Sequence, residues 1–218
     1  MGSTFVTIQS APWRAFTGAC VTATLYLIRH APHDHLGHIL SGRTPGIPLS
    51  DDGRGQARRL AAALSARRFA GVWSSPVQRA RETAQEIVAG RGLGVRIDAA
   101  LDEIDFGAWT GKAFEALAAD EEWGAWNTAR GEAQTPAGES MTAVQARVTD
   151  FARTIALAHS GEAIALVSHC DVIRAALAGW LGLPLGNALN FDVDPASVSR
   201  VAIGDWGARV LSINEVVA

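Results

Sequence analysis

Two short apolar segments, each followed by a histidine, constrain the fold of this chain most strongly. Residues 24–28 precede Arg29 and His30, and residues 163–167 precede His169 by one position. Short runs of strand-forming apolar residues with polar residues at their ends are typical of buried β-strands. Two such segments, with amphipathic helical patterns between them, predict an α/β fold with a largely parallel sheet.

Strand and helix patterns alternate along the rest of the chain. Ser50 and Ser140 are placed to cap helices, and Ser75 with Pro76 is typical of a third helix start. Further strands are expected at 71–74 and 95–97, and two more within 197–214. Helices are also expected near 112–119 and at about 171–181. The irregular segment 106–138 is interpreted as an insertion lying over another part of the molecule.

The length of 218 residues favours one domain. Residues 1–22 are interpreted as a loose N-terminal extension, and residues 23–218 as the domain. The longest uncharged run, 175–191, contains glycines and a proline and is too short to span a bilayer. Two cysteines, Cys20 and Cys170, cannot form a disulfide framework. These features favour a cytoplasmic protein with no membrane partner.

The net charge of −3 excludes the global basic field of a nucleic-acid-binding protein. Individual arginines can still create a local positive charge where the two histidines lie. Because ligands of open α/β sheets bind beyond the carboxyl ends of the strands, His30 and His169 face one crevice if their strands are neighbours. Arg29 adjoins His30, and Arg79 lies one turn inside a helix whose N-terminal end favours anions. The pattern predicts a pocket for a phosphoryl group.

Histidines and arginines together suit phosphoryl transfer. A neutral imidazole can attack phosphorus and form a phosphohistidine, while the arginines bind the remaining phosphate oxygens. Nearby positive charge lowers the pKa of His30 and keeps it neutral. The leaving alkoxide needs a proton donor, for which Glu103 and Asp105 are the candidates.

Six segments, in this order and spacing, resemble the histidine phosphatase superfamily, in its phosphoglycerate mutase-like branch. The resemblance covers about residues 24–214. The segments are 27–31, 42–57, 74–84, 101–111, 136–140 and 166–169. It implies a three-layer α/β/α fold with a mostly parallel central sheet and a short insertion over the active site.

By this resemblance, His30 is the phosphorylated nucleophile and Glu103 the general acid, and the family needs no metal and no cofactor. Arg29, Arg79 and His169 complete the catalytic phosphate pocket. The expected phosphate- or substrate-binding residues are Ser41, Gly42, Arg43, Cys170 and Trp109. The implied partner is a small phosphorylated substrate, and the oligomeric state is left open, with a homodimer as one of the options.

The chain departs from the family pattern after His30. Ala31, Pro32 and His33 stand where the family usually has Gly, an acidic residue and Thr or Ser. An asparagine that often helps bind phosphate is absent, and His33 or His35 is a candidate substitute. Cys170 lies four residues before Arg174, whereas a thiolate phosphatase requires a spacing of six, so Cys170 is expected as a small residue at a helix start.

The residues are compatible with more than one function. Hydrolysis of a small phosphomonoester is favoured over a phosphoglycerate mutase-type transfer, because Lys112 and Arg130 are the only basic residues of 106–138. A non-catalytic phospholigand-binding protein and a phosphohistidine protein phosphatase are two further hypotheses. Trp109, Trp123 and Trp126 are expected in the core, and the competing hypothesis places them in a lid over an organic leaving group.

Overall fold

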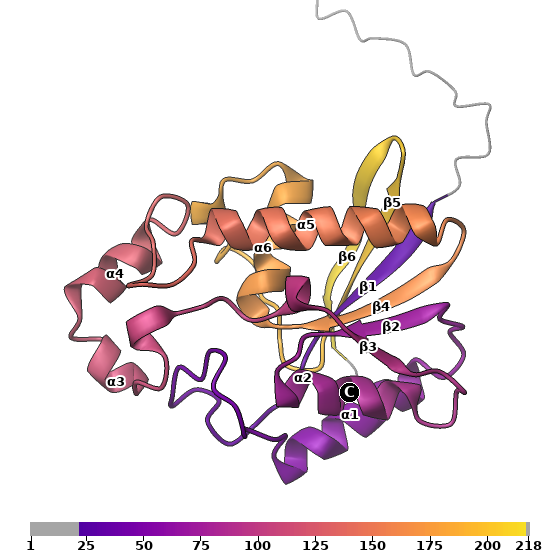
Figure 1. Cartoon of the computed structure of the whole chain (residues 1–218), viewed down its shortest axis with the longest axis horizontal. Helices are drawn as coiled ribbons and strands as arrows, with labels where there is room; N and C mark the ends of the chain where they lie inside the picture. Colours follow the sequence, from indigo (N-terminus) through magenta and orange to yellow (C-terminus); the bar gives the residue numbers. More distant parts are fainter. Residues whose placement is uncertain (1–21, 217–218) are drawn as a thin grey trace, which may run out of the picture.

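The computed structural model describes residues 22–216, so the interpretation of residues 1–21 as an extension lies outside the described residues. Within this range, six strands form one sheet in the order β3-β2-β4-β1-β5-β6. The strands β3, β2, β4 and β1 pair in parallel, and β5 and β6 add an antiparallel hairpin beside β1. The expectation of a mostly parallel central sheet is confirmed (Figure 1).

The strands follow the apolar segments of the sequence closely. Each of the four parallel strands was expected within one residue of where it lies, and the tail forms two strands as predicted. The strands are β1 (Ala23–Arg29), β2 (Gly71–Ser74), β3 (Val95–Ile97), β4 (Ala163–Ser168), β5 (Val198–Gly204) and β6 (Gly207–Glu215).

Helices cover both faces of the sheet (Figure 1). The helices α1 (Asp51–Ala63) and α2 (Gln78–Val88) lie on one face, and α5 (Met141–Ala158) and α6 (Cys170–Leu181) on the other. Residues of β1 alternate between the two cores: Leu25 and Leu27 belong to the cluster of α5 and α6, and Tyr26 and Ile28 to that of α1 and α2. A strand buried on both faces has a continuous apolar run, as residues 24–28 do.

Two of the three expected helix caps are present. Ser50 Oγ accepts a hydrogen bond from the Gly53 amide, and Ser140 Oγ accepts one from the Ala143 amide. The expectation for Ser75 and Pro76 is wrong, because α2 begins at Gln78 after Val77. The Ser75 side chain accepts a hydrogen bond from the Val77 amide, one residue before the helix begins, and its other partners lie in the polar site beyond the strand ends.

The segment 106–138 forms a lobe beside the sheet, seen at the left of Figure 1. It contains α3 (Phe114–Leu117), shorter than the helix expected near 112–119, and α4 (Glu121–Thr128), which was not predicted. Asp120 caps α4 by accepting hydrogen bonds from the amides of Glu122 and Trp123. A β-bridge between Ile39 and Ala113 joins this lobe to the loop that follows His30.

Short 3₁₀ turns occur at Ala99–Leu101, Gly107–Trp109 and Leu185–Asn187. Within residues 22–216, no helix combines the length and apolar character needed to cross a membrane. The residues that follow the carboxyl ends of the parallel strands β1, β2 and β4 include His30, Ser75 and His169.

Two glycines of α1 provide a matched test of how tightly the loop after His30 packs. A Cβ at Gly53 would overlap the carbonyl oxygen of Pro32, whereas a Cβ at Gly55 would meet only the flexible end of Arg59 at 3.6 Å. We expect Gly53→Ala to lower the free energy of unfolding by about 1–3 kcal/mol. Gly55→Ala should raise it by about 0.5–1 kcal/mol, because alanine favours a helix interior. Urea denaturation measures both, and equal effects would contradict this packing.

Candidate active site

The two histidines predicted to share a crevice lie side by side. The strands β1 and β4 are parallel neighbours whose register ends with Arg29 opposite Ser168, so His30 and His169 occupy the next positions. The His30 amide donates a hydrogen bond to the Ser168 carbonyl at 3.0 Å. The ring centroids of the two histidines are 5.1 Å apart. The sequence placed both histidines at one crevice on the condition that their strands are neighbours, and this condition is met.

The hydrogen bonds of His30 define its tautomer. Nδ1 lies 2.8 Å from the carbonyl oxygen of Ala31, which can only accept, so Nδ1 carries the proton. Nε2 then presents a lone pair, which accepts a hydrogen bond from Arg79 Nε at 3.1 Å. The imidazole is 3% exposed, so its unprotonated nitrogen is aimed into the protein rather than toward bulk solvent.

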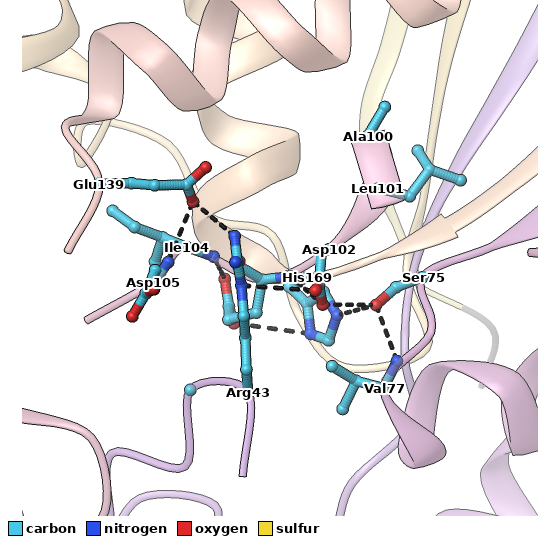
Figure 2. A network of polar contacts seen from close by, with 12 residues as sticks. Arg43, Ser75, Val77, Ala100, Leu101, Asp102, Ile104, Asp105, Glu139 and His169 are labelled. Carbon is cyan, nitrogen blue, oxygen red and sulfur yellow. Dashed lines mark hydrogen bonds and ion pairs between the residues drawn. The ribbon is translucent and has the colours of Figure 1, made fainter. Parts of the chain in front are cut away.

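A polar network holds His169 in place (Figure 2). The Nε2 atom of His169 lies 2.8 Å from Ser75 Oγ, and Ser75 in turn donates to Asp102 Oδ1 at 3.2 Å. Since Ser75 uses its proton toward Asp102, His169 Nε2 is the donor of this pair. The Nδ1 atom of His169 can then accept from Arg79 Nη2 at 3.2 Å.

Arg79 connects the parts of the site. It projects from the first turn of α2 and is 2% exposed. Besides both histidines, it contacts the carbonyl oxygen of Gly42 through Nη2 at 2.8 Å. Its Nη1 has no hydrogen-bond partner among the described residues, and neither does Arg29 Nε. Buried guanidinium nitrogens without a partner are an exception that calls for an explanation, and an anionic ligand would provide one.

Burial and positive charge keep both histidines neutral. Burial, followed by the charge of Arg79, holds the pKa of His30 and of His169 well below the usual range. Arg29 contributes further to the lowering of the His30 pKa. A neutral imidazole with its lone pair on Nε2 is the form that can act as a nucleophile.

Glu103 lies beside the histidines, with one carboxylate oxygen 3.5 Å from His169 Nδ1 and 3.8 Å from Arg79 Nη2. Burial raises the pKa of Glu103 to about 7, with the charge of Asp171 adding to the effect and Arg79 opposing it. A carboxyl with this pKa can hold or release a proton near neutral pH. Asp105, the other predicted proton donor, accepts from the Gly107 amide and is not among the residues that line the cavity.

Two arginines hold the backbone of Glu103, and Figure 2 shows one of them, Arg43, beside Glu139. Arg43 Nε and Arg147 Nη2 donate to the Glu103 carbonyl at 2.7 and 3.3 Å, respectively. The Glu139 carboxylate lies between them, 2.6 Å from Arg43 and 3.1 Å from Arg147. The side chain of Arg43, expected to contact phosphate, is therefore engaged outside the cavity and positions the segment that carries Glu103.

The cavity at His30 has a volume of about 120 Å³, and His169, which is fully buried, is not among its lining residues. Of the predicted phosphate- or substrate-binding residues, Ser41, Gly42 and Cys170 line it. His33 also lines it, with its ring 5.5 Å from that of His30, whereas His35 does not. Burial raises the pKa of the Cys170 thiol to about 11, so it stays protonated and is a poor nucleophile.

Trp109 does not reach the cavity. It is 1% exposed and packs in the core of the lobe against Trp123 and Trp126, with ring centroids 5.2 and 6.0 Å away. Its indole nitrogen donates to Asp120 at 3.2 Å. The aromatic side chains that do line the cavity are Phe106 and Phe114. The tryptophans thus pack in the core of the lobe as expected, with Trp123 partly buried. Phe106 and Phe114 face the cavity instead.

Sequence reasoning missed the roles of Ser75, Asp102, Glu139 and Arg147. Ser75 could have been found by the rule used for the histidines, because it directly follows the strand β2 and its amide donates to Val167 of the neighbouring β4. The contact between Arg147 and Glu139 joins one helix to the loop before it, and no local pattern distinguishes it from a solvated pair. Among residues 22–216, no cluster of three or more His, Cys, Asp or Glu is arranged to hold a metal ion.

The sequence profile described as histidine phosphatase superfamily (branch 1) matches residues 25–216. The chain therefore belongs to this superfamily. It is 30% identical to phosphoserine phosphatase 1 of Hydrogenobacter thermophilus, over 87% of this chain and 91% of that protein. It is 29% identical to the adenosylcobalamin/α-ribazole phosphatase of Salmonella typhimurium, over 87% and 95% of the two chains. The structure of Bacillus stearothermophilus YhfR superposes with a TM-score of 0.82 at 28% identity, covering 87% of this chain and 96% of that one.

The raised pKa of Glu103 predicts a pH dependence of stability. Its pKa is about 7 in the folded protein and near 4.5 when solvated, so the folded state binds more protons between these values. The contribution of Glu103 to stability is therefore fully present below about pH 4.5 and is lost as pH rises through about 7. Glu103→Gln cannot titrate, so its free energy of unfolding relative to the wild type should increase over this range. Urea denaturation from pH 5 to 8 measures the difference, and a constant difference would contradict the raised pKa.

Proposed function

We propose that this protein hydrolyses small-molecule phosphomonoesters through a phosphohistidine formed on His30. The observation that carries the proposal is the unprotonated Nε2 of a neutral His30, held 3.1 Å from the buried guanidinium of Arg79. A phosphate oxygen that replaces this hydrogen bond frees the Nε2 lone pair and brings phosphorus beside it. Arg29 and Arg79 then face the developing charge on the phosphoryl oxygens, and His169 orients Arg79 by accepting a hydrogen bond from its Nη2.

The reaction has two steps. In the first, the Nε2 lone pair of His30 forms the N–P bond as the ester P–O bond breaks, and protonated Glu103 gives its proton to the leaving oxygen. In the second, a water molecule attacks phosphorus, and its proton returns to the Glu103 carboxylate. The N–P bond then breaks and releases inorganic phosphate. The two steps together return His30 and Glu103 to their starting states.

Hydrolysis is supported over a mutase-type transfer by the charge of the cavity. Among the described residues, the guanidinium or ammonium groups that line it are those of Arg29 and Arg79 alone. Both are close to the histidines, and a phosphoglycerate would need another cation for its carboxylate. The names of the two relatives, phosphoserine phosphatase and adenosylcobalamin/α-ribazole phosphatase, agree with hydrolysis. A cytoplasmic location, supported by the cysteine content, completes the proposal.

Replacement of the nucleophile tests the mechanism. We expect His30→Ala to abolish turnover of p-nitrophenyl phosphate, because the substitution removes the nitrogen that forms the N–P bond. Wild-type protein quenched during turnover of ³²P-labelled substrate should carry acid-labile label on His30. EDTA should leave the wild-type rate unchanged. Full activity of His30→Ala would overturn the proposal, and ligand binding without label or turnover would favour a non-catalytic phospholigand-binding protein.

The proton donor is tested with two leaving groups. Ethyl phosphate needs protonation of its leaving oxygen, whereas p-nitrophenolate leaves without it. Glu103→Gln should therefore reduce kcat about 10²-fold or more for ethyl phosphate and far less for p-nitrophenyl phosphate. In the wild type, kcat for ethyl phosphate should fall as pH rises above about 7, because Glu103 loses its proton. This fall should be absent in Glu103→Gln, and equal losses on both substrates would exclude Glu103 as the acid.

A further inference from the structure

The part of the cavity beyond the phosphate pocket has a distinct composition. Leu36 and Ile39 come from the loop after His30, and Phe106 and Phe114 come from the lobe 106–138. Leu36, Ile39 and Phe114 are each half-buried, so they present apolar surface to whatever enters. The β-bridge between Ile39 and Ala113 holds the two segments together. A leaving group attached to a phosphate at His30 would contact this apolar wall.

The cavity also has an acidic residue in its lining. Asp171, in the first turn of α6, lines the cavity and is only partly buried. The N-terminal end of a helix stabilises a carboxylate, and Arg130 donates to Asp171 Oδ1 at 2.6 Å. Asp171 therefore adds a carboxyl group to a cavity that is also lined by Arg29 and Arg79.

Arg130 does not itself present a cation to the cavity. It is 7% exposed and is not among the lining residues. Its guanidinium stacks over the Trp126 ring at 4.0 Å and donates to Asn127 as well as to Asp171. It lies behind Asp171 and fixes the orientation of that carboxylate. A substrate would meet the carboxylate of Asp171 rather than the guanidinium of Arg130.

We propose that this wall selects phosphomonoesters whose leaving group is apolar and either uncharged or cationic, with Asp171 discriminating against a second anionic group. This inference rests on the proposed phosphatase activity. A carboxylate in the leaving group would face Asp171 across a poorly solvated cavity, where like charges repel strongly. Discrimination by such a repulsive contact is a common source of specificity. An ammonium or hydroxyl group would instead find a hydrogen-bond acceptor in the same place.

Three alkyl phosphates of matched length test the charge preference. Phosphoethanolamine, ethyl phosphate and 2-phosphoglycolate share the phosphate and the adjoining carbon, and they end in a cation, a neutral group and an anion. We expect kcat/KM for phosphoethanolamine to exceed that for 2-phosphoglycolate by about tenfold or more. Any general-acid effect common to the three substrates cancels in this ratio. A ratio of one or below would overturn the proposal.

Two variants assign the effect to residues. Asp171→Asn keeps the shape and the acceptor for Arg130 but removes the charge, so the ratio should fall at least fivefold. Glu115→Gln is the matched control, because Glu115 is exposed on α3 and does not line the cavity, and its ratio should stay at the wild-type value. An unchanged ratio in Asp171→Asn would remove Asp171 from the proposal.

The apolar part is tested with benzyl phosphate against ethyl phosphate. Phe114→Ala should lower kcat/KM for benzyl phosphate several-fold more than for ethyl phosphate, and equal losses would contradict the apolar wall.

Different results would refute the proposed phosphatase function and the inferred specificity. Wild-type protein that hydrolyses none of these esters and acquires no label on His30 refutes the proposed function. Wild-type protein that hydrolyses them without the predicted preferences refutes only the inferred specificity.

Discussion

The rest of the site depends on the hydrogen bonds of the buried Arg79 guanidinium. It contacts His30, His169 and the Gly42 carbonyl, which come from three different parts of the chain. Removing a guanidinium from water is costly unless polar partners surround it. Here the partners are largely neutral, so the positive charge stays available to an anion. Burial, followed by this charge, lowers the pKa of both histidines, so Arg79 both offers a cation and helps to keep the proposed nucleophile neutral.

The lobe 106–138 determines what can reach these groups. Its tryptophans pack against one another in the core of the lobe, with Trp109 and Trp126 each 1% exposed. Phe106 packs against Trp126 with ring centroids 5.7 Å apart and also lines the cavity. The stability of the lobe and the shape of the apolar wall therefore share residues.

Local signals in the sequence were more reliable than those that depend on distant partners. Strands buried on both faces were predicted well, because a run such as residues 24–28 has no polar face to obscure it. The helix caps at Ser50 and Ser140 were also predictable. The Ser75 prediction failed because α2 begins only at Gln78, and the Ser75 side chain binds His169 and Asp102 as well as the Val77 amide. Arg43 was expected at the phosphate for its place in the motif, yet its pairing with Glu139 turns it away.

The sequence alone determined the alternating strands and helices, the histidine after each of two buried strands, and the superfamily these features indicate. These properties depend on local periodicity and on residue type at fixed spacing. Only the tertiary structure decided that the two strands are adjacent in register, that Glu103 rather than Asp105 stands beside His169, and that Asp171 faces the cavity. Burial and charge at these positions arise from segments far apart in the chain. They raise the pKa of Glu103 and lower that of His30, and no local pattern encodes them.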